Sequence, residues 1–411
     1  MKKVLRKIVS MLSVGIMAVS LAACGASSAD SSTSVTEAAS AESSVSEEAV
    51  AAVSEETEAA EPVTQSDYEH PIVKEKLKVG LMIQYVNAES MIRNKYQAEI
   101  EAAHRDWELI VNEFETADKF RDAFQSLMNQ DVDAIILCNT ESMDSRVDLI
   151  KQAREKGIGV YCNDNQVVDG IICNSTMPGG VASMELAYKI GEDNNWNLNM
   201  CVLNYKTGQV HLERAYPFEA LTGALGQVYP NYKLLAEEDA SSGTQGSGQA
   251  CYEFTQAWLQ KYGDEMNGIF ATCDEMAFGA VEAISQSGDT TGEKCFVSGI
   301  DGGNQAWRYI RENTPFQYCY SQPFELFTHK VFEVIDQIQV QGLNPGDEGC
   351  DISEWGETMY STGIVVTRDN CPEIGQSVHS VYDYYGGDPD DADAWYNWTD
   401  GPGIYVVSDG E

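Results

Sequence analysis

The stretch TCDEMAFGA, residues 272–280, sets two carboxylates side by side where an apolar run gives way to helix-forming residues. Asp274 and Glu275 therefore stand at the exit of an expected strand, 268–273. In open parallel sheets, ligands bind beyond the carboxyl ends of the strands, because strand ends and helix N-termini present free polar groups there. Ionised carboxylates there accept hydrogen bonds of about 1.5–3 kcal/mol each from ligand hydroxyls. The chemistry to expect is therefore recognition of a small polar molecule.

Polar residues follow the other expected strands in the same way. They are Gln84, Asn87, Asn139, Thr140, Asn163, Asp164, Asn165 and Asn204, and later Asp239 and Asp301. Any single one has a structural explanation, since Asp and Asn commonly cap the following helix. Several on the same edge of two sheets favour a shared polar cleft.

Apolar runs alternate with helix-like segments from Leu77 onward, which predicts parallel βαβ units. The runs are apolar on both faces, as in a sheet covered by helices on each side. The alternation restarts near residue 199, so we expect two α/β lobes. The expected strands are 77–83, 107–115, 132–140, 157–165, 171–176, 199–205, 232–240, 268–273, 294–302, 316–323 and 362–370. The expected helices are 90–105, 118–129, 144–156, 184–190, one from 213, 248–261, 275–287, one from 304, and 324–341.

Residues 1–24 have the features of an export signal. A basic start precedes an apolar stretch that is too short for a comfortable transmembrane helix. The end of this stretch, LAAC, resembles the bacterial lipobox, so Cys24 is the expected lipidation site and the protein an extracytoplasmic one, lipid-anchored to the cell membrane. An ordinary secretory signal with a chance cysteine is the alternative. Residues 25–76, rich in Ser, Ala and Glu without helical period, are expected to be a disordered acidic tether.

Composition and motifs exclude several classes of function. The formal net charge of −39 repels phosphate backbones, so no nucleic-acid partner is expected. The cysteines show no zinc-like spacing, so no metal site is expected; a disulfide between Cys350 and Cys371 stays open. The tail's acidic run, 388–393, lacks the glycine and glutamate of a calcium loop. There is no GxSxG, HExxH, P-loop or complete GxGxxG after the first strand, and the five histidines form no constellation, so no enzyme, catalytic residue or cofactor is expected.

Residues 77–370 resemble the type I periplasmic sugar-binding proteins, the ribose- and galactose-binding family of ABC transporters. The segments that carry the resemblance are LKVGLMI, VDAIILCNT, GVYCNDNQ, ERAYPF, CDEMAFGA and SGIDGG. The resemblance implies an α/β fold of two doubly wound parallel-sheet lobes joined by a hinge. It places 77–176 plus 323–350 in the N-terminal lobe, 177–322 plus 355–375 in the C-terminal lobe, and 376–411 in an acidic aromatic tail.

The resemblance also implies site residues. Asp164 and Asp301 match aspartates that accept hydrogen bonds from sugar hydroxyls, and Arg214 matches an arginine that grips ring or hydroxyl oxygens. Cys273 stands where the family usually has a ligand-binding asparagine, and Asn165 where many members have arginine. The full set of expected ligand-binding residues is Tyr85, Asn87, Asn139, Asp164, Asn165, Arg214, Cys273, Asp301 and Gln322, with Ser321 as the alternative to Gln322.

Two expectations concern residues around this set. Asp274 fits the family's helix-starting aspartate and is expected to cap its helix, with Glu275 supporting the first helical turn. Tyr85 is the expected stacking ring in the first strand–helix loop. Other candidate platforms are Trp196, Trp258 and Trp307, which as tryptophans in helices also fit the core.

The expected function is capture of a monosaccharide or related polyol by a monomeric lipoprotein that delivers it to an ABC transporter permease. The alternative is a sensory binding protein that presents a sugar, nucleoside or furanosyl signal to a membrane receptor kinase. A regulator of the lactose-repressor type shares this fold, but it would need a basic helix-turn-helix where this chain has a signal and an acidic tether.

Overall fold

The computed structural model describes residues 68–85, 87–139, 142–242, 247–382, 388 and 390–410. All of these belong to one contact unit, Glu61–Glu411. The expected signal peptide, the lipidation site Cys24, most of the tether and Thr140 lie outside the described residues. Within the described part of the chain, no helix is both long and apolar enough to span a membrane.

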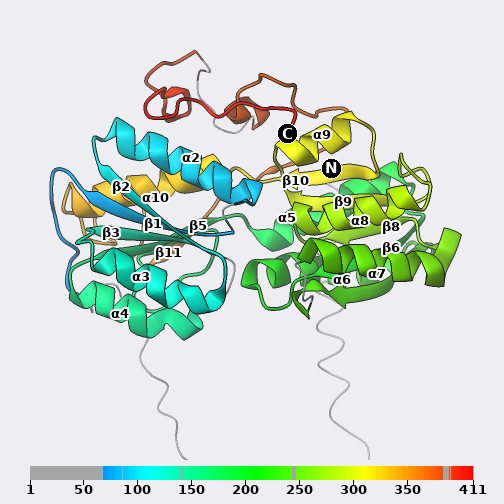
Figure 1. The fold of residues 1–411 in the computed structure, drawn as a ribbon, viewed down its shortest axis with the longest axis horizontal. Coiled ribbons are helices and arrows are strands. Elements are labelled where there is room, and N and C mark those ends of the chain that lie inside the picture. The colour runs from blue at the N-terminus through cyan, green and yellow to red at the C-terminus, as the bar shows by residue number, and fades with distance from the viewer. Residues whose placement is uncertain are drawn as a thin grey trace, which may run out of the picture. The chain divides into compact units, whose positions relative to one another are not determined.

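Two six-stranded sheets form the framework (Figure 1). The first has the order β11-β5-β4-β3-β1-β2, and the second β12-β10-β9-β8-β6-β7. Every pair is parallel except β10 and β12. The strands are β1 (Lys78–Gln84), β2 (Glu108–Phe114), β3 (Ala134–Cys138), β4 (Gly159–Asn163), β5 (Cys173–Thr176), β6 (Leu198–Asn204), β7 (Tyr232–Asp239), β8 (Gly268–Ala271), β9 (Phe296–Asp301), β10 (Phe316–Ser321), β11 (Glu357–Tyr360) and β12 (Ile364–Val366).

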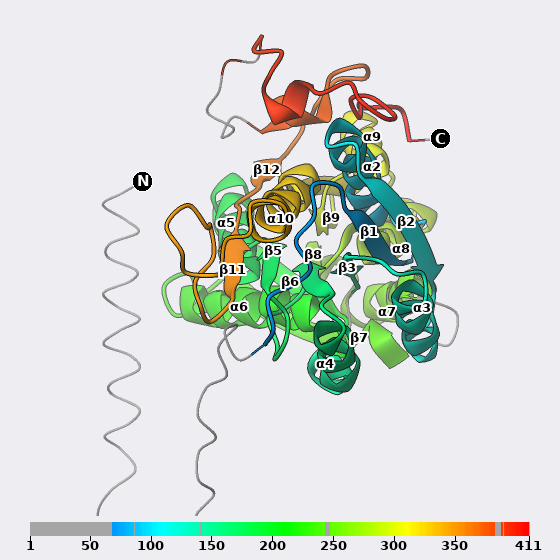
Figure 2. The ribbon, with the colours of Figure 1, turned by 90° about the vertical axis from the view of Figure 1, so that its left-hand side faces the viewer.

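Helices cover both faces of each sheet, as the apolar strands require (Figures 1 and 2). In the first lobe, α2 and α10 pack on one face and α3 and α4 on the other. In the second lobe, α7, α8 and α9 pack on one face and α5 and α6 on the other. The helices are α2 (Glu89–His104), α3 (Phe120–Met128), α4 (Val147–Glu155), α5 (Gly179–Asp193), α6 (Gln209–Gly226), α7 (Ser247–Tyr262), α8 (Asp274–Gln286), α9 (Asn304–Arg311) and α10 (Phe324–Gln339).

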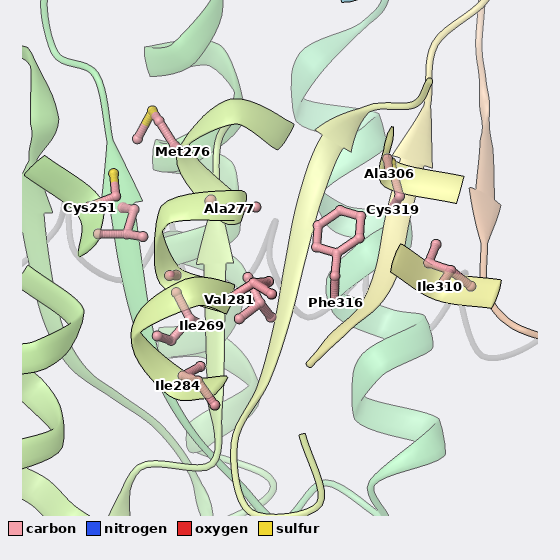
Figure 3. Packing of buried hydrophobic residues seen from close by; sticks show 14 of the residues in the cluster. Cys251, Ile269, Met276, Ala277, Val281, Ile284, Ala306, Ile310, Phe316 and Cys319 are labelled. Carbon is pink, nitrogen blue, oxygen red and sulfur yellow. The ribbon is translucent and has the colours of Figure 1, made fainter. Parts of the chain in front are cut away.

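The hydrophobic core between α8 and β8 fixes the position of the strand end. The residues that follow this strand end belong to the functional site. Met276, Ala277, Val281 and Ile284 of α8 are buried against Ile269 of β8 (Figure 3). These residues recur three or four positions apart, the spacing that puts side chains on one helix face. The apolar face therefore fixes the orientation of the helix N-terminus, where Cys273 and Asp274 lie.

The chain passes between the two sheets three times, after β5, after β10 and after β11. The expected placing of 355–375 wholly in the second lobe is wrong, because β11 pairs with β5 of the first sheet and only β12 joins the second. Strand β11 has exposed ends and no continuous apolar run, so its sequence, ETMY, gives no strand signal. All eleven expected strands and all expected helices are confirmed, although α6 begins at Gln209 and not at residue 213.

The C-terminal segment, 376–410, contacts both lobes (Figures 1 and 2). Val378 and Val407 are buried in the second-lobe core. Trp398 stacks on His104 of α2, with ring centroids 3.6 Å apart, and Trp395 stacks on His329 of α10 at 4.4 Å. Trp395 and Trp398 are thus packing residues. Among the described residues, including the acidic run at 388–393, no group of His, Cys, Asp and Glu suits a metal ion.

Cys350 and Cys371, whose pairing the sequence left open, do not form a disulfide in this structure. Both are free thiols. Cys350 packs against the first-lobe core, whereas Cys371 packs against the second-lobe core and its Sγ lies 3.3 Å from the carbonyl oxygen of Trp307.

Candidate ligand-binding site

A cavity of about 750 Å³ lies where strand ends of both sheets meet. This volume falls in the range of small-molecule sites. The first lobe contributes residues that follow β1, β2 and β4, and the second lobe residues that follow β6, β8 and β9, together with one face of α6. Six of the expected site residues line it: Tyr85, Asn87, Asp164, Arg214, Cys273 and Asp301.

Arg214 lies at the centre of the site and faces both lobes. Its Nη1 donates to the carbonyl oxygen of Thr272 at 2.8 Å and to Oδ1 of Asp301 at 3.2 Å. Its Nη2 lies 3.7 Å from Oδ2 of Asp164 in the first lobe, just beyond hydrogen-bonding distance. A ligand between the lobes can therefore meet one cation and two carboxylates from opposite sides.

Asp301 ends β9 and is held by its neighbours. Gln322 Nε2 donates to Asp301 Oδ1 at 2.7 Å, so Gln322 positions this carboxylate from behind. Burial raises the pKa of Asp301 to about 6, Arg214 opposes that rise, and the negative charge of Asp164 adds to it. Asp164 in turn accepts a hydrogen bond from Thr176 Oγ1 at 2.6 Å.

Three cavity residues have positive φ angles, which residues other than glycine rarely adopt. The φ angles of Tyr85, Asp164 and Asp301 are 54°, 58° and 148°. Residues in such regions cost of order 1–3 kcal/mol each and cluster at functional sites. The backbone strain at these strand exits thus supports the same site as the cavity does.

Asp274 does not cap its helix, contrary to the expectation. Cys273 occupies the N-cap position, and the carboxylate of Asp274 instead accepts from the backbone N–H of Gly302 at 2.8 Å. A Cβ at Gly299 would collide with this carboxylate, so glycine is required there. Burial, with a contribution from the negative charge of Asp301, raises the pKa of Asp274 to about 8. Asp274 is therefore mainly a neutral acid at pH 7 that fixes the loop after β9.

The raised pKa of Asp274 predicts that stability falls as the pH rises from 6.5 to 8. In this window the unfolded state has lost this proton, since an exposed aspartate has a pKa near 3.9, while the native state retains it. The native state binds more protons, so the free energy of unfolding decreases by about 1–2 kcal/mol. His211 and His379 have pKa values lowered by burial to about 3 and about 4, so their opposing effect lies mainly between these values and the unfolded value near 6.5.

Urea denaturation at pH 6.5 and pH 8 tests this. In Asp274→Asn the fall is expected to be smaller, because asparagine does not titrate; the remaining fall comes from Glu219, whose pKa burial raises to about 7. Asp264→Asn is the matched control, since its side chain is 92% exposed. An Asp274→Asn variant with the parent's full pH dependence would show that another group is responsible.

Three expected site residues do not line the cavity. Asn139 and Asn165 are buried beside it, where Asn165 Nδ2 donates to the backbone carbonyl of Asn139 at 2.6 Å. Gln322 lies behind Asp301. The candidate tryptophan platforms are also not at the site: Trp258 and Trp307 lie in the second-lobe core, and Trp196 stacks on Tyr229.

Several cavity residues are not among those expected from the sequence. His211 lies three positions before Arg214, and Phe278 three positions after Glu275, so helical periodicity could have placed both at the site. Tyr205 follows the exit residue Asn204. With Tyr85, the rings of Tyr205 and Phe278 supply the aromatic surface that the tryptophans do not. Other missed lining residues include Glu89, Glu115, Met91 and Met276.

Comparison with known proteins assigns this architecture to a family. Residues 80–338 match the family described as a periplasmic binding protein domain. The xylitol-binding protein of Mycolicibacterium smegmatis is 24% identical over 186 residues, which is 44% of this chain and 50% of that protein. The chain thus spans about half the length of this relative. The ribose import binding protein RbsB of Bacillus subtilis is 25% identical over 272 residues, covering 64% of this chain and 82% of that protein.

Solved structures share the fold. The periplasmic binding protein of the arabinose ABC transporter of Shewanella sp. ANA-3, bound to L-arabinofuranose, superposes with a TM-score of 0.62 at 18% identity, covering 72% of this chain and 93% of that one. The fructose-binding periplasmic domain of a hybrid two-component system gives 0.58 at 17% identity, covering 72% and 92%. With the two-lobed α/β fold and the cavity at the sheet edges, the match over residues 80–338 shows that this chain belongs to the periplasmic binding protein family and is a binding protein, not an enzyme.

Proposed function

We propose that this protein captures a monosaccharide or related polyol between its lobes and delivers it to the permease of an ABC transporter. The observation that carries the proposal is the position of Arg214 between Asp164 of the first lobe and Asp301 of the second, at the wall of a cavity of small-molecule size. The named binding functions of the relatives, for xylitol and ribose, support the same ligand class.

The chemistry of the lining suits hydroxylated rings and chains. Carboxylates accept hydrogen bonds from hydroxyl groups, and the guanidinium of Arg214 donates to hydroxyl or ring oxygens. Tyr85, Tyr205 and Phe278 supply apolar faces against which C–H groups can pack. Micromolar affinity needs about 8 kcal/mol, which a few charge-assisted hydrogen bonds and one packed ring supply after entropy costs.

Export, a lipid anchor at Cys24 and a monomeric state belong to the same proposal. A lipid anchor with a long acidic tether would keep the binding domain close to the extracytoplasmic face of the permease, where the ligand is released to it. Closure of the lobes around the ligand would give the permease a distinct shape to recognise.

The test is a thermal-shift screen of residues 25–411 against sugars, polyols and nucleosides. A ligand that binds only the folded state stabilises it by about 2.7 kcal/mol at a hundred times its Kd, so the melting temperature is expected to rise by several degrees for a sugar or polyol. The proposal fails if nucleosides shift the melting temperature and no sugar or polyol does.

A sensory role is the second candidate, favoured by the structural similarity to a fructose-binding domain of a two-component system. Cells that lack the gene separate the two. Loss of uptake of the identified ligand supports transport, whereas normal uptake with a lost transcriptional response to that ligand supports sensing.

A further inference from the structure

The cavity carries a marked excess of negative charge. Its lining contains six carboxylates: Glu89, Glu115, Asp164, Asp274, Glu275 and Asp301. Among the described lining residues, Arg214 is the one arginine or lysine. His211 adds no charge at neutral pH, because burial, with a smaller effect of Arg214, lowers its pKa to about 3. Leaving aside Asp274, whose pKa burial raises to about 8, five carboxylates of the lining face a single guanidinium.

The hydrogen bonds and ion pairs among the described residues leave this excess uncompensated. Glu89 accepts from the backbone N–H of Asn304 and from the hydroxyl of Tyr405, both at 2.9 Å, and Glu275 accepts from Ser247 Oγ at 3.1 Å. These donors are neutral, so they satisfy the oxygens without cancelling the charge. Asp164 and Asp301 share Arg214.

We propose that the natural ligand carries a protonated amine, as an amino sugar or amino polyol does, and that the cavity excludes acidic sugars and sugar phosphates. This inference rests on the proposed function and narrows its ligand class. Like charges in a cleft of low dielectric repel strongly, so an ammonium group relieves the excess while an anion adds to it.

The aromatic lining supports the same conclusion. Tyr85, Tyr205 and Phe278 border the cavity, and a cation within about 6 Å of such a ring face is attracted by its quadrupole. The chain's net charge of −39 also raises the local concentration of cations near the cleft. A cationic hydroxylated ligand therefore uses the carboxylates, the rings and the overall field together.

The experiment compares matched ligands on the same scaffolds. Calorimetry at pH 6.5 would measure D-glucose, D-glucosamine and D-glucuronate, and the corresponding neutral, amino and acid forms of galactose and ribose. The expected result is that an amine-bearing form binds at least tenfold more tightly than its neutral parent, and that no acid form binds. The inference would be overturned if the neutral sugars bound as tightly as their amine-bearing forms, or if any acid form bound more tightly than its neutral parent. Either result would leave the proposed function standing. No binding by any member of the panel would overturn the inference, and the thermal-shift screen then decides the proposed function by itself.

A charge-removal variant tests the cause. Glu115→Gln with Glu275→Gln removes two exposed carboxylates of the lining and is expected to reduce the amine-to-neutral affinity ratio at least threefold. Glu312→Gln with Glu293→Gln removes the same charge from exposed positions that do not line the cavity and is expected to leave the ratio unchanged. An equal effect of both double variants would assign the preference to net charge and overturn the role of the cavity.

Discussion

Replacing Arg214 by glutamine is expected to weaken binding of a neutral sugar or polyol by about a hundredfold. Both hydrogen bonds to the protein leave from Nη1, so the N–H groups of Nη2, at the wall of the cavity, can donate to ligand oxygens. Two charge-assisted bonds of at least about 1.5 kcal/mol each are lost. Since 1.4 kcal/mol is a factor of ten, the two together account for this loss.

The companion variants Asp164→Asn and Asp301→Asn are each expected to weaken binding tenfold or more, because they keep the size of the side chain and remove its charge. Isothermal titration calorimetry measures these affinities. Arg121→Gln is the control, since Arg121 lies in an exposed ion pair with Asp148 and does not line the cavity. An Arg214→Gln variant within threefold of the parent would contradict the site. For an amine-bearing ligand the loss is expected to be smaller, because removal of a cation also removes repulsion.

The fold could be predicted from the sequence because its strands are apolar on both faces and its helices lie between them at regular spacing. The buried strands β3 and β4, AIILC and GVYCN, are examples in which nearly every residue contributes to the core. Strand β11 could not be predicted, because it is a four-residue edge strand whose one partner, β5, lies far from it in the chain.

The site could be predicted in part for the same reason. Asp164, Cys273 and Asp301 follow parallel strands, and the carboxyl ends of such strands meet at one edge. The order of the strands does not determine whether a side chain after the strand end points into the cavity or away from it. Asn165, directly after Asp164, turns to the backbone of Asn139, and this depends on contacts between loops that no local pattern encodes.

The burial and protonation of the carboxylates at the site could not be predicted from the sequence. Asp274 and Glu275 are adjacent in the sequence, yet one is buried and largely neutral while the other is exposed. The difference comes from Gly299, which makes room for the Asp274 carboxylate, and from the N–H of Gly302, both on or next to β9. Two adjacent carboxylates in the sequence therefore differ in burial and charge because β9 lies next to one of them.

Replacing Glu325 by glutamine is expected to lower the free energy of unfolding by about 3–5 kcal/mol. Glu325 and Arg93 form a bidentate ion pair, with both nitrogen–oxygen distances 2.7 Å and side chains 1% and 0% exposed. Removing one member leaves the other charge buried without its partner, which is strongly destabilising. Urea denaturation measures the change, and Asp148→Asn in the exposed pair with Arg121 should cost about 1 kcal/mol or less.

The double replacement Arg93→Met with Glu325→Met separates charge from packing. Removing both charges is expected to restore part of the loss, because no uncompensated ion stays buried. The restoration is incomplete, since Arg93 also donates to the backbone carbonyl oxygens of Gly302 at 2.8 Å and Gln322 at 3.1 Å. A double variant less stable than Glu325→Gln would show that these carbonyl contacts outweigh the ion pair.

The same contacts link stability to the ligand site. Arg93 belongs to α2 of the first lobe, whereas Gly302 and Gln322 flank Asp301 in space, one as the next residue and the other as its hydrogen-bond donor. Tyr382, from the C-terminal segment, accepts from Arg93 at 2.9 Å and donates to the carbonyl of Gln322. If this link positions Asp301, the double variant will bind ligand more weakly even at temperatures where it is fully folded; parent-like affinity would confine the role of Arg93 to stability.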